Sequence, residues 1–253
     1  MKQNYISIVI PAYNEEQRIS KCLLSLNEFM RKQDYDYEVI VSDDGSTDKT
    51  IELVEEFTKE WKSLKIIKNK HKGKAPAIIS GIYATNSKFT LFTDVDLSVP
   101  IIELPKLLNW VDEKGFDVAI ASREGVGAQR LNEPYMRHLM GRVFNLIVQV
   151  LVLPGINDTQ CGFKLFKTEV IKEIFDRTVL YGRKDEEIKG AKVSAFDVEM
   201  LYVAKFLGYK IKEVPVTWTY ADNSKVHNLK DSCYNAKDVL RVRLNSLRGL
   251  YKK

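Results

Sequence analysis

Two aspartates separated by one residue, Asp94 and Asp96, are the side chains of this 253-residue chain that point most directly to chemistry. They follow the apolar run 88–93, whose aromatic and β-branched residues predict a buried strand. The carboxylates are therefore expected at the carboxyl end of a strand, where open α/β sheets bind their ligands. Paired carboxylate oxygens suit Mg²⁺ or Mn²⁺ shared with substrate phosphates. Taken alone, the pair could equally begin a solvated loop that caps the next helix.

Three further polar loops, 11–15, 43–47 and 71–74, could serve the same ligand if it is a nucleotide diphosphate. The carboxylate of Asp44 can accept hydrogen bonds from a base or from ribose hydroxyls. An ordinary helix cap would explain the Ser and Thr that follow, but not two adjacent aspartates. In the third loop, Gly73 allows close backbone approach and Lys74 supplies a point charge for phosphate. The chain has neither a Walker loop nor a Gly-x-Gly-x-x-Gly dinucleotide loop.

Alternating strands and helices must position these loops. Hydrophobic periodicity predicts strands at 5–10, 37–42, 64–68, 89–93 and 116–121, with helices at about 15–31, 48–61, 75–84 and 101–113. This alternation is typical of an α/β fold with a doubly wound parallel sheet, so all four loops should gather at one sheet edge. The pattern loosens after residue 121, and the charged stretch 181–193 is expected to be a mobile loop.

Composition narrows the class of protein. The chain is 45% hydrophobic and 29% charged, which is ordinary for a globular protein, and it has no apolar stretch of the roughly 20 residues needed to cross a bilayer. A strand is expected from the N-terminus onward, without a signal peptide before it, and three scattered cysteines favour a cytosolic protein. The histidines lack zinc spacing, and basic residues are not interleaved with aromatics as in single-strand binders, so no nucleic-acid partner is expected.

The motifs in combination resemble a known family. IPAYNEE, VSDDGSTDKT, the Gly-Lys loop and TDVDLSVP look like those of family 2 glycosyltransferases. The later segments ASR, DTQCGFKLF, AFDVEML and EVPVTW resemble polyprenyl-phosphate glycosyltransferases, in particular the dolichyl-phosphate β-glucosyltransferase branch. The resemblance implies a GT-A fold, a Rossmann-like, mostly parallel sheet in one catalytic domain over 1–222. That domain would have a nucleotide-binding half, 1–122, and an acceptor-binding half, 123–222, followed by a basic amphipathic helical segment at 223–253.

The resemblance also assigns roles to residues. Asp94 and Asp96 would hold the Mg²⁺ or Mn²⁺, Asp96 and Asp158 would be catalytic, and Asp158 would be a base or an orienting group. A turn or helix cap explains Asp158 equally well without the resemblance. The residues expected to bind the nucleotide are Pro11, Tyr13, Asn14, Glu15, Asp43, Asp44, Gly45, Ser46, Gly73, Lys74 and Asp94.

The implied reaction is inverting transfer of a hexose from a nucleotide-sugar donor, UDP-glucose being the first choice, to a polyprenyl or dolichyl monophosphate. A phosphate monoester is largely dianionic at neutral pH and needs cationic positioning more than a strong base. The candidates for that positioning are Arg123, Arg137, Arg142 and Lys225. Three alternatives stay open: a GDP-mannose-dependent transferase, a soluble transferase that uses Asp158 as a true base towards a carbohydrate hydroxyl, and a non-catalytic nucleotide-binding module.

Two stretches could meet a membrane surface. The tail 225–253 contains eight basic and two acidic residues, a net charge of +6 against +5 for the whole chain. Its stripe of Leu240, Leu244, Leu247 and Tyr251 predicts a basic amphipathic helix that lies on anionic lipid. Residues 136–151 predict a second amphipathic helix, for which packing on the core is the usual explanation. We therefore expect peripheral attachment to the cytoplasmic face of a membrane.

Overall fold

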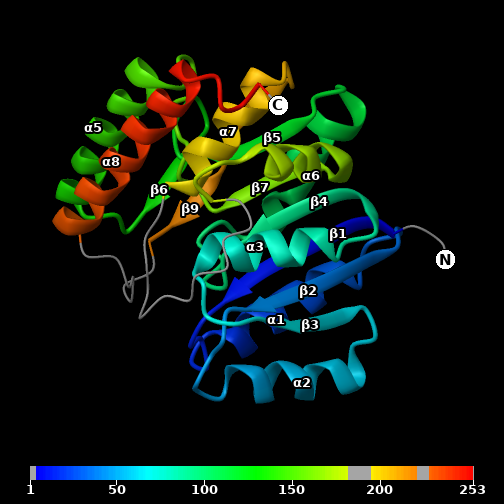
Figure 1. The fold of residues 1–253 in the computed structure, drawn as a ribbon. Helices are drawn as coiled ribbons and strands as arrows, with labels where there is room; N and C mark the ends of the chain where they lie inside the picture. Colours follow the sequence, from blue (N-terminus) through cyan, green and yellow to red (C-terminus); the bar gives the residue numbers. More distant parts are fainter. Residues whose placement is uncertain (1–3, 182–194, 221–227, 253) are drawn as a thin grey trace.

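The computed structural model describes residues 4–181, 195–220 and 228–252, and within these residues the centre of the protein is a seven-stranded sheet. The strands are ordered β3-β2-β1-β4-β7-β5-β8 (Figure 1). Their bounds are β1 Asn4–Ala12, β2 Tyr37–Asp43, β3 Leu64–Lys68, β4 Ser87–Thr93, β5 Val118–Ser122, β7 Phe163–Lys167 and β8 Ile211–Pro215. All neighbours pair in parallel except β7, which is antiparallel to both β4 and β5. The predicted mostly parallel α/β sheet is confirmed.

Helices cover both faces of the sheet, because its strands are apolar on both sides. In β1, Ile8 and Ile10 face a core shared with α1 (Ile19–Met30) and α4 (Leu104–Leu108). Val9 faces the opposite core, which is built with α3 (Lys74–Tyr83), α6 (Thr168–Arg177) and α7 (Phe196–Phe206). Fully buried strands of this kind are typical of parallel sheets. The helix α2 (Thr50–Glu60) packs beside α1.

Most elements predicted in the first half of the chain lie within a few residues of the observed bounds, and β3 matches at both ends. The predicted helix 101–113 is three short pieces in succession, η1 (Ile101–Glu103), α4 and η2 (Asn109–Glu113). The strand β7 was not predicted, although all its residues except Lys167 lie in the DTQCGFKLF motif. The charged stretch that was expected to be a loop lies outside the described residues apart from Tyr181, and Lys225 also lies outside them.

The later part of the chain adds two long helices and a small ribbon. Helix α5 (Tyr135–Leu151) and helix α8 (Asn228–Leu247) lie side by side at one end of the molecule (Figure 1). Strands β6 (Gln129–Leu131) and β9 (Thr217–Thr219) form the ribbon. Val239, Val242 and Tyr251 reach from the C-terminal part into the core under α7, so Tyr251 is a core residue and was wrongly placed in the outer stripe.

Candidate active site

The loops after β1 and β2 are joined by hydrogen bonds at the carboxyl edge of the sheet. The backbone N–H of Asn14 donates to Ser46 Oγ at 2.9 Å, and the N–H of Thr47 donates to Asn14 Oδ1 at 2.8 Å. Asn14 has a φ of 52°, a left-handed conformation that asparagine tolerates better than most residues. The first two polar loops therefore meet at one edge, as the alternation of strands and helices predicts.

Asp43 and Asp44 are both buried and brace these loops. Asp43 Oδ1 accepts the N–H groups of Gly45 and Ser46, each at 2.9 Å. Asp44 Oδ1 accepts the N–H of Lys72 at 2.8 Å, and Asp44 Oδ2 accepts the N–H of Gly73 at 2.9 Å. The two carboxylates thus fix the shape of the second and third loops, and their contact with a nucleotide stays a prediction.

An aromatic stack lies next to Asp44. The rings of Tyr13 and His71 are parallel within 5°, with their centroids 4.0 Å apart, and His71 Nδ1 lies 2.8 Å from Asp44 Oδ2. The stack offers a flat surface at the edge where nucleotide binding is expected. His71 was not among the predicted site residues, although its place in the loop after β3 was the available signal.

Asp94 and Asp96 follow β4, with Val95 between them. Val95 is buried in the core, which directs the two aspartates on either side of it away from that core. Asp94 Oδ1 lies 2.6 Å from Lys74 Nζ, and Asp96 Oδ1 accepts the N–H of Ser98 at 3.0 Å. Although desolvation acts to lower the pKa of Lys74, the charges of Asp94 and other nearby aspartates raise it overall.

A divalent cation fits this pair chemically. Within the described ranges no three His, Cys, Asp or Glu side chains are grouped as a metal site would need, so Asp94 and Asp96 would supply two carboxylates alone. Mg²⁺ and Mn²⁺ are held in this way when substrate phosphates and water complete their coordination.

Asp158 is completely buried, and both of its carboxylate oxygens accept hydrogen bonds from neighbouring residues. Arg123 donates to both of its oxygens, from Nε at 2.7 Å and from Nη2 at 2.8 Å, and the Arg123 N–H adds a third bond at 2.9 Å. The N–H of Gln160 donates to Oδ1 at 3.2 Å. Burial raises the pKa of Asp158, but the charge of Arg123 and these hydrogen bonds outweigh it and hold the pKa at about 2. This geometry favours an orienting role over a basic one.

Glu213 of the EVPVTW motif supports the same loop. Its Oε1 accepts the N–H of Asp158 and its Oε2 accepts the N–H of Asn157, both at 2.9 Å. The Arg123 guanidinium also lies over the ring of Trp218, 5.3 Å from its centroid. The motifs ASR, DTQCGFKLF and EVPVTW therefore meet in one hydrogen-bonded cluster around the buried Asp158. Glu213 was not predicted as a site residue, although its motif was noted.

A second buried ion pair joins two other motifs. Lys164 of β7 is fully buried and pairs with Asp197 of α7, and its Nζ also donates to the carbonyl of Cys161 at 2.6 Å. Asp197 is among the charges that raise the pKa of Lys74, so this pair lies near the acidic loop after β4. Lys164 and Asp197 were not assigned roles from the sequence.

Of the arginines expected to bind phosphate, Arg123 directly follows β5, and Arg137 and Arg142 lie in the first half of α5. Arg142 is half-exposed and pairs with Glu124 Oε2 at 2.8 Å, and Arg137 lies over the ring of Tyr220 at 4.9 Å from its centroid. Arg130, which was not predicted, pairs with Glu124 at 2.5 Å and with Glu133 at 2.6 Å. Arg123 is largely committed to Asp158. Of the predicted phosphate ligands that the structure describes, Arg142 is exposed, whereas Arg137 and Arg123 are partly buried.

Both α5 and α8 expose large apolar side chains. The predicted stripe on α5 is packed on the core only in part, at Phe144, Val148 and Leu151. The large apolar residues that remain exposed are Tyr135, Met136, Leu139, Val143, Leu146, Ile147 and Val150 on α5, and Leu240, Leu244 and Leu247 on α8. None of the helices in the described part of the chain is long and apolar enough to span a membrane.

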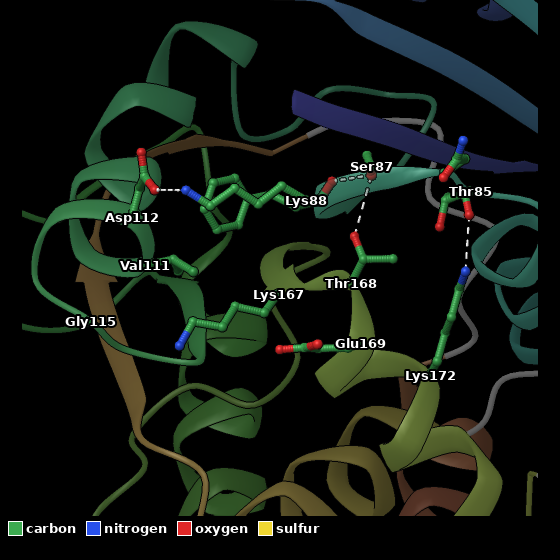
Figure 2. Close-up of a pocket in the computed structure, with 12 residues that line it drawn as sticks. Thr85, Ser87, Lys88, Val111, Asp112, Gly115, Lys167, Thr168, Glu169 and Lys172 are labelled. Atoms are coloured by element: carbon green, nitrogen blue, oxygen red, sulfur yellow. Dashed lines mark hydrogen bonds and ion pairs between the residues drawn. The ribbon is translucent and has the colours of Figure 1, made fainter. Parts of the chain in front are cut away.

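A separate pocket of about 600 Å³ lies at the opposite edge of the sheet, around the start of β4 (Figure 2). Its lysines are bonded within the chain: Lys88 to Asp112 at 2.6 Å and Lys172 to the carbonyl of Thr85 at 2.9 Å. Lys167 similarly pairs with Asp117. The pocket is remote from the acidic loop after β4, and we assign it no ligand.

Comparison with known proteins identifies the class. The sequence profile described as "Glycosyl transferase family 2" matches residues 7–175. The chain is 31% identical to a dolichyl-phosphate beta-glucosyltransferase of Dictyostelium discoideum, over 98% of this chain and 76% of that protein. It is 33% identical to the Homo sapiens protein of the same name, over 98% and 77%. The chain therefore belongs to glycosyl transferase family 2 and is a glycosyltransferase.

Solved structures agree with this fold. Glucosyl-3-phosphoglycerate synthase from Mycobacterium tuberculosis, in complex with Mn²⁺, UDP-glucose and phosphoglyceric acid, superposes with a TM-score of 0.63 at 17% identity, over 97% of this chain and 80% of that one. The mannosyltransferase PcManGT from Pyrobaculum calidifontis, in complex with GDP-Man and Mn²⁺, gives 0.58 at 17% identity, over 99% and 70%. The expected GT-A fold is confirmed.

Proposed function

We propose that the protein transfers glucose from UDP-glucose to dolichyl phosphate or a related polyprenyl phosphate, with inversion at the sugar. The observation that carries this proposal is the similarity to dolichyl-phosphate beta-glucosyltransferases, which extends over 98% of the chain and so covers the segments of the second half. Because the similarity spans the acceptor-binding half as well as the nucleotide-binding half, it supports both the acceptor and the donor.

The state of Asp158 supports a phosphate acceptor over a carbohydrate hydroxyl. A hydroxyl nucleophile needs a base with a pKa near the working pH, whereas Asp158 has a pKa of about 2 and its oxygens accept hydrogen bonds from Arg123 and from the N–H of Gln160. A lipid monophosphate already carries its negative charge. It would need cations for positioning, and Arg137 and Arg142 in the first half of α5 are the candidates.

The donor would bind at the edge formed by the four loops. Asp94 and Asp96 would hold a Mg²⁺ or Mn²⁺ ion, which supplies Lewis-acid stabilisation of charge on the diphosphate leaving group. Lys74 would add a positive charge beside the same diphosphate. The loops braced by Asp43 and Asp44, with the Tyr13–His71 stack, would bind the nucleoside. Asn14, Glu15 and Ser46 would hold the first two loops in that shape.

The lipid acceptor accounts for the exposed apolar side chains of α5 and α8. Both helices would lie on the cytoplasmic face of a membrane, with apolar side chains in the interfacial layer and basic side chains near anionic headgroups. Arg137 and Arg142 would then lie near the level of the lipid phosphate, where the acceptor is presented. Docking of this kind needs no membrane-spanning helix.

A donor screen tests the proposal. Purified protein is incubated with radiolabelled UDP-glucose, GDP-mannose or another UDP-hexose, with Mn²⁺ or Mg²⁺ and a short polyprenyl phosphate, and labelled sugar is counted in the organic phase. We expect label from UDP-glucose alone, and none in the presence of excess EDTA. Label that stays in the aqueous phase for every donor would refute the proposal, and label from GDP-mannose alone would replace glucose by mannose.

A further inference from the structure

The side chain of Lys74 forms an ion pair with one carboxylate oxygen of the expected metal site. Lys74 is the first residue of α3, and its Nζ lies 2.6 Å from Asp94 Oδ1. Both side chains are more than one-third exposed, so solvent and solutes reach the pair. Exposed ion pairs are individually weak and exchange readily for other partners.

Asp94 has little freedom to offer its other oxygen instead. A Cβ atom added to Gly162 would lie 2.1 Å from Asp94 Oδ2. This oxygen is therefore packed against the backbone of Gly162, the residue that directly precedes β7. Two other acids act on the charge of Lys74: Asp197 is committed to Lys164 in a buried pair, and Asp96 is expected to be a ligand of the same metal ion. Lys74 and an incoming cation therefore compete for Oδ1 of Asp94.

We propose that Lys74 is an exchangeable counter-cation, which neutralises Asp94 until a divalent metal ion binds and then pairs with the diphosphate of the nucleotide. The inference rests on the proposed function, because it takes Asp94 as a metal ligand and a nucleoside diphosphate as part of the donor. Its consequence is that the metal ion and the nucleotide bind cooperatively through one side chain.

An ammonium group and a divalent cation repel each other. Binding of the metal ion at Asp94 Oδ1 therefore breaks the Lys74–Asp94 ion pair, and this loss weakens metal binding. The displaced ammonium gains a strong partner only if phosphate oxygens are present, since lysine binds phosphate as a compact point charge. Each ligand thus lowers the cost of binding the other, and by linkage the two effects on affinity are equal.

The test measures Mn²⁺ binding by the loss of the free-ion EPR signal and UDP binding by calorimetry, for the wild type and for Lys74→Met, which keeps most of the aliphatic stem and removes the charge. We expect Lys74→Met to bind Mn²⁺ alone about fivefold more tightly than the wild type, and to bind UDP in the presence of Mn²⁺ about fivefold more weakly. The gain in Mn²⁺ affinity on adding UDP should shrink by a similar factor.

Lys32→Met serves as the matched control, because Lys32 forms an exposed ion pair with Glu28 on α1 and its loss changes the net charge equally. Asp94→Asn should lose Mn²⁺ binding, and Lys74→Gln should repeat the effect of Lys74→Met. Mn²⁺ affinity that is unchanged or weaker in both Lys74 variants overturns the inference, as does the absence of Mn²⁺ binding to the wild type. No acceptor is used, so a wild type that shows this coupling but transfers no glucose would refute the proposed function alone.

Discussion

Gly162 faces Asp94 one residue beyond the antiparallel pairing of β7 and β4, whose terminal partners are Phe163 and Thr93. Asp94 Oδ2 fills the space that a side chain at position 162 would need, since an added Cβ would lie 2.1 Å from it. Pairing of the unpredicted strand β7 with β4 thus places Gly162, which has no side chain, next to the expected metal site. The DTQCGFKLF and TDVDLSVP motifs are coupled through this contact.

Gly162→Ala should displace the Asp94 carboxylate and weaken Mn²⁺ binding at least about tenfold, a loss of about 1.4 kcal/mol. The protein should still fold, because Gly162 does not have the left-handed conformation that alanine avoids. EPR titration of Mn²⁺ measures the effect, with unfolding by urea as the check on stability. Gly141→Ala in α5 is the control: an added Cβ there meets nothing within 4 Å, and alanine should stabilise the helix by roughly 0.5–1 kcal/mol. Equal Mn²⁺ affinity in both variants would contradict the role of this contact.

The sequence predicts the first half of this site well because each loop there follows a strand of clear periodicity. Asp94 and Asp96 were located by the apolar run before them, and Lys74 by its adjacent glycine. The roles of Gly162 and Glu213 could not be predicted in the same way, because each depends on strand pairing between segments far apart in the chain. The Lys164–Asp197 pair similarly depends on the packing of α7 against β7. Likewise, the commitment of Asp158 to Arg123 is a tertiary contact over 35 positions, whereas the sequence shows only an aspartate in a polar loop.

Asp158→Asn should lower the free energy of unfolding by about 3–5 kcal/mol, because it removes one charge of a buried pair and leaves Arg123 without its full partner. Urea titration at low temperature measures the loss. Replacing both residues, with Arg123→Met and Asp158→Leu, should recover a large part of the stability. If Asp158→Asn loses less than about 1 kcal/mol, the pair is not structurally important.

The low pKa of Asp158 also predicts the pH dependence. Its folded pKa of about 2 lies below the ordinary value near 3.9, so its contribution to stability is full above about pH 4 and is lost as the pH falls through about 2. For the same reason, kcat should show no ionisation of Asp158 between about pH 5 and pH 9. An acidic limb in that range that disappears in Asp158→Asn would restore the base role.

Glu199 should give the opposite pH dependence. Burial raises its pKa, against the N–H groups of Val179, Leu180 and Tyr181 and the Tyr251 hydroxyl, which all favour the carboxylate. A raised folded pKa means that the contribution of Glu199 to stability is present below its unfolded pKa near 4.3 and is lost as the pH rises through the folded pKa.

The stability difference between the wild type and Glu199→Gln should therefore be larger at pH 4 than at pH 8 in urea titrations. Glu28→Gln, a change at an exposed position on α1, should show no such trend. A difference that grows with pH would mean that the hydrogen bonds outweigh burial at this carboxyl.

Replacing Leu240, Leu244 and Leu247 by Gln should weaken binding to vesicles that contain anionic phospholipid. Each of these side chains is at least half exposed in the protein, so its loss should cost about 1 kcal/mol of transfer into the lipid interface, or about a hundredfold in total affinity.

Point substitutions are preferable to deletion of residues 236–253, because deletion would also remove Val239, Val242 and Tyr251 from the core. Leu24→Gln on α1, where Leu24 is 59% exposed, is the matched control. Co-sedimentation measures the binding, and added salt should weaken it by screening Arg241 and Arg248. If the triple variant and the control sediment equally with vesicles, α8 does not contact lipid, and the attachment would have to rest on α5.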